Sequence, residues 1–582
     1  MRPELWLLVL GTSLALEPPE ARTLLGLYTG TVVTSASGKQ RCPAFLGIPF
    51  AQPPIGELRF RTAKSIEEPW EGARAATKHA PACVQMPMKV EEDDDYPELL
   101  DSEDCLYLDV ILPDTTHSNL TAALPVLVYI HGGGFVIGAG GLTHKPSVAC
   151  DSFVGSNVIL VILQYRLGFL GFASTGDEAL PGNLGLWDQI AALRWVSENM
   201  GAFGGDPERV TMFGNSAGGG SVSILTYSPP AQAFFRSAVS LSGSALAYWV
   251  LNEDSVHRTR QLAQKLSCEG TSADIVACLR DKSLEKLRTA NQELFGKALY
   301  HAYPPVPGVT GGGQRIWESL KFGWNPRVDG ILLPRHPRNL PAPQKAFLTG
   351  TTAVETNILF APPPFFRRYL NLRPPMIVEE AEGMEEVSLD LALAKAVRII
   401  LGPNLDDEEV KRMAEEAKSY YLTEEVTKPP PPTSSLLNAT IRLSSDIWMD
   451  VPALEEAELK ARAGAQVWVY SLSYYRNVTF PPHYPYKGSP HGENTFLVFF
   501  DEQQNEKDRQ FARHFAAAIA SMARQGRPNW PSSHWPRFEL AANPQFLDMD
   551  EEAREGKGIF HSAANAFWLQ LKHRLETSKH EL

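Results

Sequence analysis

Short apolar runs alternate with helical patterns through the first half of the chain. The runs at residues 125–130 and 158–163 have the length and aliphatic content of buried strands. Between residues 186 and 196, apolar side chains recur at steps of three and four, which predicts a helix. Buried strands that alternate with such helices predict an α/β fold, in which a large, mostly parallel sheet is covered by helices on both faces.

The regions on either side predict further elements. Residues 28–33 and 42–48 are β-like, and a turn near Gly38 separates them. In the second half of the chain, residues 389–401 predict a helix. The proline runs at 362–364 and 429–432 predict surface excursions between helices.

Another β-like run, at residues 210–213, leads into the sequence Gly214-Asn-Ser216-Ala-Gly218. A serine between two glycines, in the order strand, sharp turn, helix, is the pattern of a nucleophile elbow. Glycine is expected on both sides, because a Cβ atom there would clash with the strand or the helix. Since glycine and serine are common, the bare pattern also fits an ordinary glycine-rich turn.

The apolar run at 125–130 ends in His131-Gly-Gly-Gly134. Glycines at this place leave backbone N–H groups able to face a ligand. An acyl transfer passes through a tetrahedral oxyanion that needs two or three such donors, and Ala217, directly after the serine, would supply another. The triple glycine and the elbow therefore predict an acyl-transfer site, and a flexible loop is the structural alternative for the glycines.

Composition and charge narrow the class of protein. The chain has 582 residues, of which 44% are hydrophobic and 21% are charged, as in an ordinary globular protein. Length alone suggests about three or four domains, but no clean linker divides the chain, so we expect one domain over residues 22–578. The net charge of −13 argues against nucleic acid as a general partner, because phosphate binding needs a basic surface.

Both ends of the chain carry targeting patterns. The short apolar core at residues 5–10 predicts a secretory signal peptide within residues 1–21, cleaved between Ala15 and Ala21; a buried helix is the alternative. The final Lys579-His-Glu-Leu582 is similar to the K-D-E-L signals, which predicts a retrieval receptor as partner and residence in the endoplasmic reticulum lumen, or secretion if the tail is not read. No later run reaches the roughly 20 apolar residues that span a bilayer, so no transmembrane segment is expected.

Six cysteines fit the oxidising compartment that a signal peptide implies. They allow about 15 connectivities, so spacing alone does not determine their pairing. Two short loops could be closed by Cys83 with Cys105 and by Cys268 with Cys278, which leaves Cys42 and Cys150 paired or free. No C-x-x-C pair suggests a metal. Acceptor sequences for glycosylation, each usable only if exposed, begin at Asn119, Asn438 and Asn477.

Further motifs, taken together with the elbow and the triple glycine, resemble the type-B carboxylesterase and cholinesterase family of α/β-hydrolases. The resemblance covers nearly the whole chain after the signal peptide. Besides the segment 45–60, the motifs that carry it are Pro69-Trp-Glu-Gly72, Ser102-Glu-Asp-Cys105, Tyr165-Arg-Leu-Gly168, Asn183-Leu-Gly-Leu-Trp-Asp-Gln189 and Phe203-Gly-Gly-Asp-Pro207. The tail resembles that of the microsomal carboxylesterases. The family implies an α/β-hydrolase fold with long insertions, and disulfides Cys83–Cys105 and Cys268–Cys278.

The resemblance also implies a catalytic triad in the chain order serine, acid, histidine. The serine maps to Ser216 and the acid to Glu355, five residues after Gly350 at a strand end. The histidine maps to His491, in a motif similar to H-G-[DE]-E that reads His491-Gly-Glu-Asn494. Among 67 acidic residues, sequence patterns alone would not have singled out Glu355, whereas His491 is, of 14 histidines, the one in a glycine-bounded loop before an apolar run.

Each residue has a role in the implied mechanism. His491 would accept the serine proton and later donate it to the leaving alcohol, while Glu355 would orient the imidazole. The N–H groups of Gly133, Gly134 and Ala217 would hold the oxyanion. No metal or cofactor is needed.

The sequence also departs from the family at the elbow and in the Cys83–Cys105 loop. The elbow usually reads G-E-S-A-G, and here Asn215 replaces the glutamate, which removes a negative charge beside the nucleophile. The Cys83–Cys105 loop is short and acidic, and it lacks the tryptophan that stacks on quaternary ammonium groups in cholinesterases. Choline esters are therefore not expected as the dedicated substrate.

Three functional hypotheses follow. The first is a lumenal serine esterase acting on small-molecule or lipid carboxylic esters, with amides and thioesters as further candidates. The second is an acylglycerol or retinyl-ester lipase that uses the same triad. The third is an inactive adhesion or binding protein similar to the neuroligin branch, whose members lack a complete triad and carry a transmembrane stalk. The sequence contains nothing that sets the oligomeric state.

Overall fold

The computed structural model describes residues 18–85, 101–113, 122–153, 156–300, 323–360, 386–402, 404–423, 435–480, 484, 487–500, 504–531, 533–540, 545–550, 554–556 and 562–580. Several predictions lie outside these residues: the apolar core of the signal peptide, Asn119, most of the Cys83–Cys105 loop, both proline runs and the last two residues of the tail.

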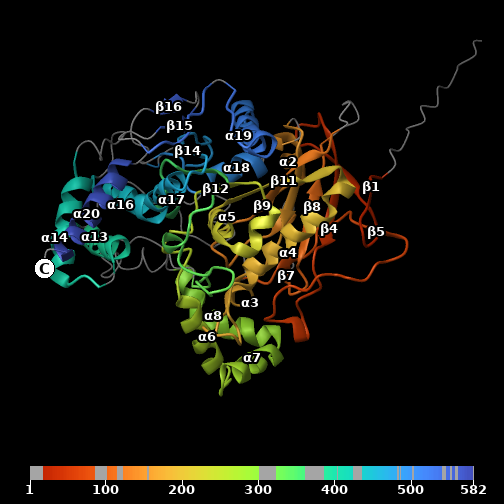
Figure 1. Ribbon diagram of the computed structural model, residues 1–582, viewed down its shortest axis with the longest axis horizontal. Coiled ribbons are helices and arrows are strands. Elements are labelled where there is room, and N and C mark those ends of the chain that lie inside the picture. Colours follow the sequence, from red (N-terminus) through yellow and green to blue (C-terminus); the bar gives the residue numbers. More distant parts are fainter. Residues whose placement is uncertain are drawn as a thin grey trace, which may run out of the picture.

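An eleven-stranded sheet forms the centre of the molecule (Figure 1). In spatial order its strands are β16 (Arg554–Gly556), β15 (Phe546–Met549), β14 (Val467–Leu472), β13 (Ala346–Thr352), β12 (Ser237–Leu241), β11 (Gly205–Asn215), β9 (Leu124–Ile130), β10 (Ile159–Leu163), β8 (Tyr107–Ile111), β4 (Arg41–Pro49) and β3 (Thr31–Thr34). The strands from β15 to β10 are parallel, and β16, β8, β4 and β3 are antiparallel to their neighbours. The predicted mostly parallel sheet is confirmed.

Alternate residues of the central strands face two separate hydrophobic cores, because side chains in a strand point to opposite faces. In β9, Val126, Val128 and Ile130 join one core, whereas Leu127 and Tyr129 join the other. All five side chains are buried. This explains why the run at 125–130 is apolar throughout instead of alternating with polar residues.

Helices cover both faces of the sheet. On one face, α4 (Leu184–Asn199) and α5 (Ala217–Tyr227) contact β11. On the other face, α19 (Glu506–Gln525) contacts β9, β11 and β12, and α2 (Pro146–Phe153) packs against α19. The helix predicted between residues 186 and 196 is α4.

Two further groups of helices extend the molecule away from the sheet. Figure 1 shows α6 (Asp254–Lys265), α7 (Ser272–Asp281) and α8 (Leu284–Tyr300) in one group. The second contains α13 (Glu386–Leu401), α14 (Asp407–Tyr421), α16 (Ser435–Ser445) and α20 (Ser562–His580), and α17 (Val451–Arg462) packs between α20 and the strands β13 and β14. Short helices α1 (Gly140–Thr143), α3 (Gly168–Phe172), α10 (Asn357–Phe360) and α18 (Glu493–Phe499) lie in connections around the sheet. The predicted helix at 389–401 falls within α13.

Small sheets lie beside the main one. One consists of β1 (Glu20–Arg22), β2 (Leu27–Thr29) and β5 (Ala73–Ala75), and the other pairs β6 (Ala82–Cys83) with β7 (Asp101–Ser102). Ala21, one end of the predicted cleavage window, is buried in β1. Cleavage after Ala21 would therefore remove part of this strand, whereas cleavage near Ala15 would leave it whole.

The six cysteines form three disulfides, Cys83–Cys105, Cys268–Cys278 and Cys42–Cys150. The first two are the pairs that the family resemblance implied. The third joins β4 to α2 and answers the open question about Cys42 and Cys150. None of the helices in the described ranges is long and apolar enough to cross a membrane.

Candidate active site

Ser216 lies at the sharp turn between β11 and α5, where the elbow was predicted. Its backbone angles, φ 59° and ψ −125°, are rare for a residue with a side chain. A Cβ atom on Gly214 would lie 2.5 Å from the carbonyl carbon of Gly218, and one on Gly218 would lie 2.0 Å from the Ile130 carbonyl oxygen. The flanking glycines are thus required by close backbone packing, and strain at the serine is the feature that marks a functional turn.

The side chain of Ser216 does not hold the turn together. A serine that precedes a helix usually accepts a hydrogen bond from the first turn of that helix, but Ser216 makes no such bond to α5. Instead, its backbone N–H donates to the carbonyl of Leu241, 2.9 Å away. The turn is therefore fixed through the backbone, and the hydroxyl is left for another role.

The triple glycine lies directly beside this serine. A Cβ atom on Gly132 would be 3.0 Å from the Cβ of Ser216. Gly133 and Gly134 have φ values of 106° and 60°, a region in which glycine is strongly favoured. Within the described part of the chain, neither glycine N–H donates a hydrogen bond. The N–H of Ala217 is in the first turn of α5, where N–H groups have no acceptor within the helix.

Buried polar contacts hold the glycine loop in place. Burial lowers the pKa of His131 to about 3, so its ring is neutral at neutral pH. Its Nδ1 lies 2.9 Å from the Gly132 carbonyl oxygen and must donate to it, because a carbonyl only accepts. The hydroxyl of Tyr165 donates to the His131 carbonyl, 2.9 Å away, and the two rings stack with their centres 4.5 Å apart.

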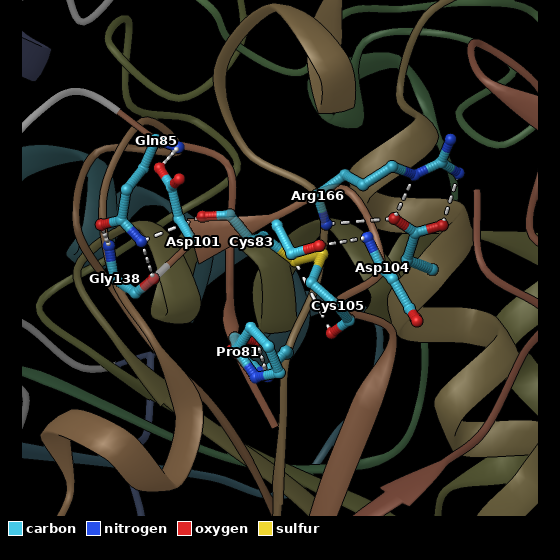
Figure 2. The surroundings of a disulfide bond; sticks show 11 residues. Pro81, Cys83, Gln85, Asp101, Asp104, Cys105, Gly138 and Arg166 are labelled. Atoms are coloured by element: carbon cyan, nitrogen blue, oxygen red, sulfur yellow. Dashed lines mark hydrogen bonds and ion pairs between the residues drawn. A yellow bond between two sulfur atoms is a disulfide. The ribbon is translucent and has the colours of Figure 1, made fainter. Parts of the chain in front are cut away.

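Gln85 anchors the far end of the same loop. Figure 2 shows its amide group against Gly138, next to the Cys83–Cys105 disulfide. The Gln85 amide nitrogen donates to the Gly138 carbonyl at 3.0 Å, and the Gly138 N–H donates to the Gln85 amide oxygen at 2.9 Å. Gln85 therefore links the region of the disulfide to the glycine loop. The sequence patterns did not predict this contact.

The predicted acid and histidine lie in contact. Glu355 follows β13, and its Oε2 lies 2.5 Å from Nδ1 of His491. The other carboxylate oxygen, Oε1, accepts a hydrogen bond from the Thr352 N–H at 2.7 Å, and the His491 N–H donates to the Glu355 carbonyl at 3.1 Å. Glu355 is fully buried and His491 is 6% exposed. Hydrogen bonds from side chain and backbone thus fix both the orientation of the imidazole and its distance from the carboxylate.

A π-helical turn, Asp446–Asp450, packs against this pair. It interrupts the path from α16 to α17 and places the ring of Trp448 4.9 Å from the ring of His491. Asp450 accepts a hydrogen bond from the hydroxyl of Thr351 at 2.5 Å, and Asp446 accepts one from Tyr421 at 2.8 Å. Burial, followed by the charge of Asp446, raises the pKa of Asp450 well above its usual range. A π-turn next to a functional residue is a recurring feature, but no sequence pattern marked it.

A buried ion pair supports the helix that follows His491. The guanidinium of Arg476 lies 2.8 Å from Oε1 of Glu493, and both side chains are almost completely buried. The Thr479 hydroxyl also donates to the Glu493 carboxylate, at 3.2 Å. The negative charge of Glu493 is therefore paired within the structure, and Glu355 is the carboxylate that contacts the imidazole of His491.

The two predicted glycosylation sites within the described residues differ in exposure. Asn438 lies in α16 and is 4% exposed, so it does not meet the condition of exposure for a glycan. Asn477 is exposed and remains a candidate. No group of three or more histidine, cysteine, aspartate or glutamate residues suited to a metal occurs in the parts of the chain that the structure describes.

A strained serine directly after a parallel strand, next to glycine N–H groups that donate no hydrogen bond to the described residues, places the chain among the serine hydrolases with an α/β-hydrolase fold. The family model described as the carboxylesterase family matches residues 17–568, and the chain belongs to this family. It is therefore a carboxylic-ester hydrolase.

Relatives agree with this assignment over almost their full length. The chain is 31% identical to the cocaine esterase of Homo sapiens, over 95% of this chain and 92% of that protein. It is 31% identical to carboxylesterase 1E of Mus musculus, over 97% and 96% respectively. It is 34% identical to the liver carboxylesterase of Sus scrofa, over 90% and 88%.

Proposed function

We propose that Ser216, His491 and Glu355 are the catalytic triad of this esterase, with the N–H groups of Gly133, Gly134 and Ala217 as its oxyanion hole. The observation that carries the proposal is the 2.5 Å contact between Glu355 and His491, made by residues far apart in the sequence. The strained backbone of Ser216 and the uncommitted N–H groups of the glycine loop support it independently.

The chemistry runs in two halves. The Ser216 oxygen attacks the ester carbonyl carbon while the imidazole of His491 accepts the hydroxyl proton. The tetrahedral oxyanion is held by the three N–H groups, and collapse breaks the bond to the alcohol, which leaves with the proton from His491. Water, deprotonated by His491, then attacks the acyl-serine, and collapse of the second tetrahedral intermediate releases the acid while His491 returns the proton to the Ser216 oxygen. Glu355 holds Nδ1–H throughout, so that the other ring nitrogen can accept the proton.

Small-molecule carboxylic esters are the proposed substrates. The names of the relatives, an esterase for cocaine among them, support this class. Amides and thioesters are further candidates, because they pass through the same tetrahedral oxyanion. The signal peptide, the retrieval-like tail and residence in the endoplasmic reticulum lumen stay predictions.

Hydrolysis of a short-chain nitrophenyl ester by the purified protein tests the proposal. Ser216→Ala is expected to lower kcat by about 10⁴-fold or more, because the nucleophile is removed. Ser283→Ala, at an exposed serine ahead of α8, is the matched control and is expected to keep the native rate. Retained turnover in Ser216→Ala would refute the assignment of the nucleophile, and a folded but inactive native protein would favour the binding-protein hypothesis.

A further inference from the structure

Two positions where this chain departs from the family pattern are in contact. Asn215 precedes the nucleophile, where the elbow motif usually has glutamate. Asn494 is the third residue after His491, where the histidine motif H-G-[DE]-E has glutamate. The amide nitrogen of Asn215 lies 2.9 Å from the amide oxygen of Asn494, and both side chains are buried. Both carboxylates of the family pattern have therefore been replaced by amides that bond to each other.

Backbone groups determine which way this hydrogen bond points. The N–H of Thr495 lies 2.8 Å from one atom of the Asn494 amide, which must be the oxygen because an N–H can only donate. The facing atom of Asn215 lies 3.3 Å from the carbonyl of Leu241, which can only accept, so that atom is the nitrogen. Asn215 is thus the donor and Asn494 the acceptor, and neither amide can turn over without losing a backbone partner.

The contact joins the two halves of the site. Asn215 ends β11 immediately before Ser216, and Asn494 is in the first turn of α18, which begins just after His491. The Asn494 amide nitrogen also faces the hydroxyls of Ser242 and Tyr470, each 3.4 Å away. Asn494 therefore ties the helix after the histidine to β11, to β14 and to the residue that follows β12.

We propose that Asn215 and Asn494 form a one-way, uncharged hydrogen bond that positions His491 against the nucleophile turn. The proposal rests on the catalytic roles of Ser216 and His491. Two carboxylates at this distance would have to share a proton, because like charges cannot both ionise so close together. The amide pair links the same two positions at every pH without a shared proton.

The charged groups closest to the Asn215–Asn494 pair interact with other residues. Glu355 contacts His491 from the β13 side, and Glu493 on α18 is paired with Arg476. Tyr470 on β14 is kept neutral, because burial raises its pKa. Two more carboxyl groups, those of Asp446 and Asp450 in the π-helical turn, lie beyond Glu355. The amide pair itself adds no charge.

Two isosteric variants separate positioning from charge. Asn494→Asp keeps an acceptor towards Asn215 and Thr495 and adds one negative charge. Asn215→Asp adds the same charge, but it replaces the donor with an acceptor that faces the Asn494 oxygen. If Asn494 turned its nitrogen towards this new carboxylate, the Thr495 N–H would meet another N–H and lose its acceptor.

Steady-state hydrolysis of the nitrophenyl ester is measured for both variants across pH, after native activity has been established. Asn215→Asp is expected to lose about 30-fold or more in kcat with KM nearly unchanged, because the histidine is misplaced. Asn494→Asp is expected to lose much less, about threefold. The deficit of Asn215→Asp should shrink as pH falls, since a protonated carboxyl can again donate.

Equal losses in the two variants, or a greater loss in Asn494→Asp, would overturn the proposal and show that added charge is what matters. Thermal unfolding of both variants identifies any that fail to fold. In that case the Asn215→Ala, Asn494→Ala and double variants form a cycle. The double variant should lose no more kcat/KM than the worse single one, and additive losses would contradict the link. An inactive native enzyme would refute the proposed triad instead.

Discussion

At the turn that carries Ser216, close backbone packing limits which residues fit, whatever their chemical role. Gly132 has no unusual φ, yet a Cβ atom there would meet the Asn215 carbonyl oxygen at 2.7 Å and the Ser216 Cβ at 3.0 Å. The position therefore requires glycine because the loop and the elbow approach each other so closely. The triple glycine supplies donors, and it also allows those donors to lie next to the serine.

Gly132→Ala is expected to lower kcat/KM for the nitrophenyl ester by about 100-fold, because the loop must move away from Ser216. Gly201→Ala is the matched control, since a Cβ atom there meets nothing within 4 Å and the backbone angle is ordinary. The steady-state kinetics and the thermal unfolding of the two variants are measured and compared. Native activity in Gly132→Ala would mean that the loop does not lie against the serine during catalysis.

The sequence predicted Ser216 and the glycine loop because their chemistry needs local backbone patterns. Glu355 has no such local signal, and only the resemblance to a family pointed to it, whereas His491 was also marked by its glycine-bounded loop before an apolar run. The contact between Asn215 and Asn494 spans 279 positions. No spacing rule could have predicted it, although both residues were visible as amides at positions where the motifs have acids.

Secondary-structure elements place a cluster of acids behind the Glu355–His491 pair. The π-turn Asp446–Asp450 brings two buried carboxyl groups near Glu355, and the charge of Glu355 contributes to the raised pKa of Asp450. Burial also raises the pKa of Asp446, to about 6. A carboxyl whose pKa is raised on folding stabilises the fold below its unfolded pKa, and that contribution is lost as pH rises through the folded value.

Asp450→Asn is therefore expected to raise the free energy of unfolding at alkaline pH, by about 1 to 3 kcal/mol at pH 8. Asparagine mimics the protonated acid, because its oxygen can still accept from Thr351 and its nitrogen can donate. Urea unfolding between pH 3 and 8 measures the effect, and the difference should vanish below the unfolded pKa of aspartate, about 4. The control is Asp407→Asn, since Asp407 is 99% exposed in its ion pair with Arg398. A variant that is less stable than the native protein at pH 8 would contradict a protonated Asp450.

At the scale of the whole molecule, three different connections between strands carry the predicted site residues to one edge of the sheet. Ser216, Glu355 and His491 follow β11, β13 and β14 in chain order, and β12 lies between β11 and β13. Carboxyl ends of parallel strands meet at the same edge, which is where open α/β sheets hold their sites. The parallel sheet was predictable from the apolar runs. The acids behind Glu355 were not, because buried polar clusters follow no sequence period.

Covalent labelling with an organophosphonate ester, followed by mass mapping of the peptides, tests the catalytic triad most directly. The reagent forms a stable bond only with a serine whose proton an adjacent base accepts. We expect one label on the native protein, on Ser216, with none on Ser216→Ala and much slower labelling of His491→Ala. A label on another serine, or equal labelling of the histidine variant, would contradict the proposed active site.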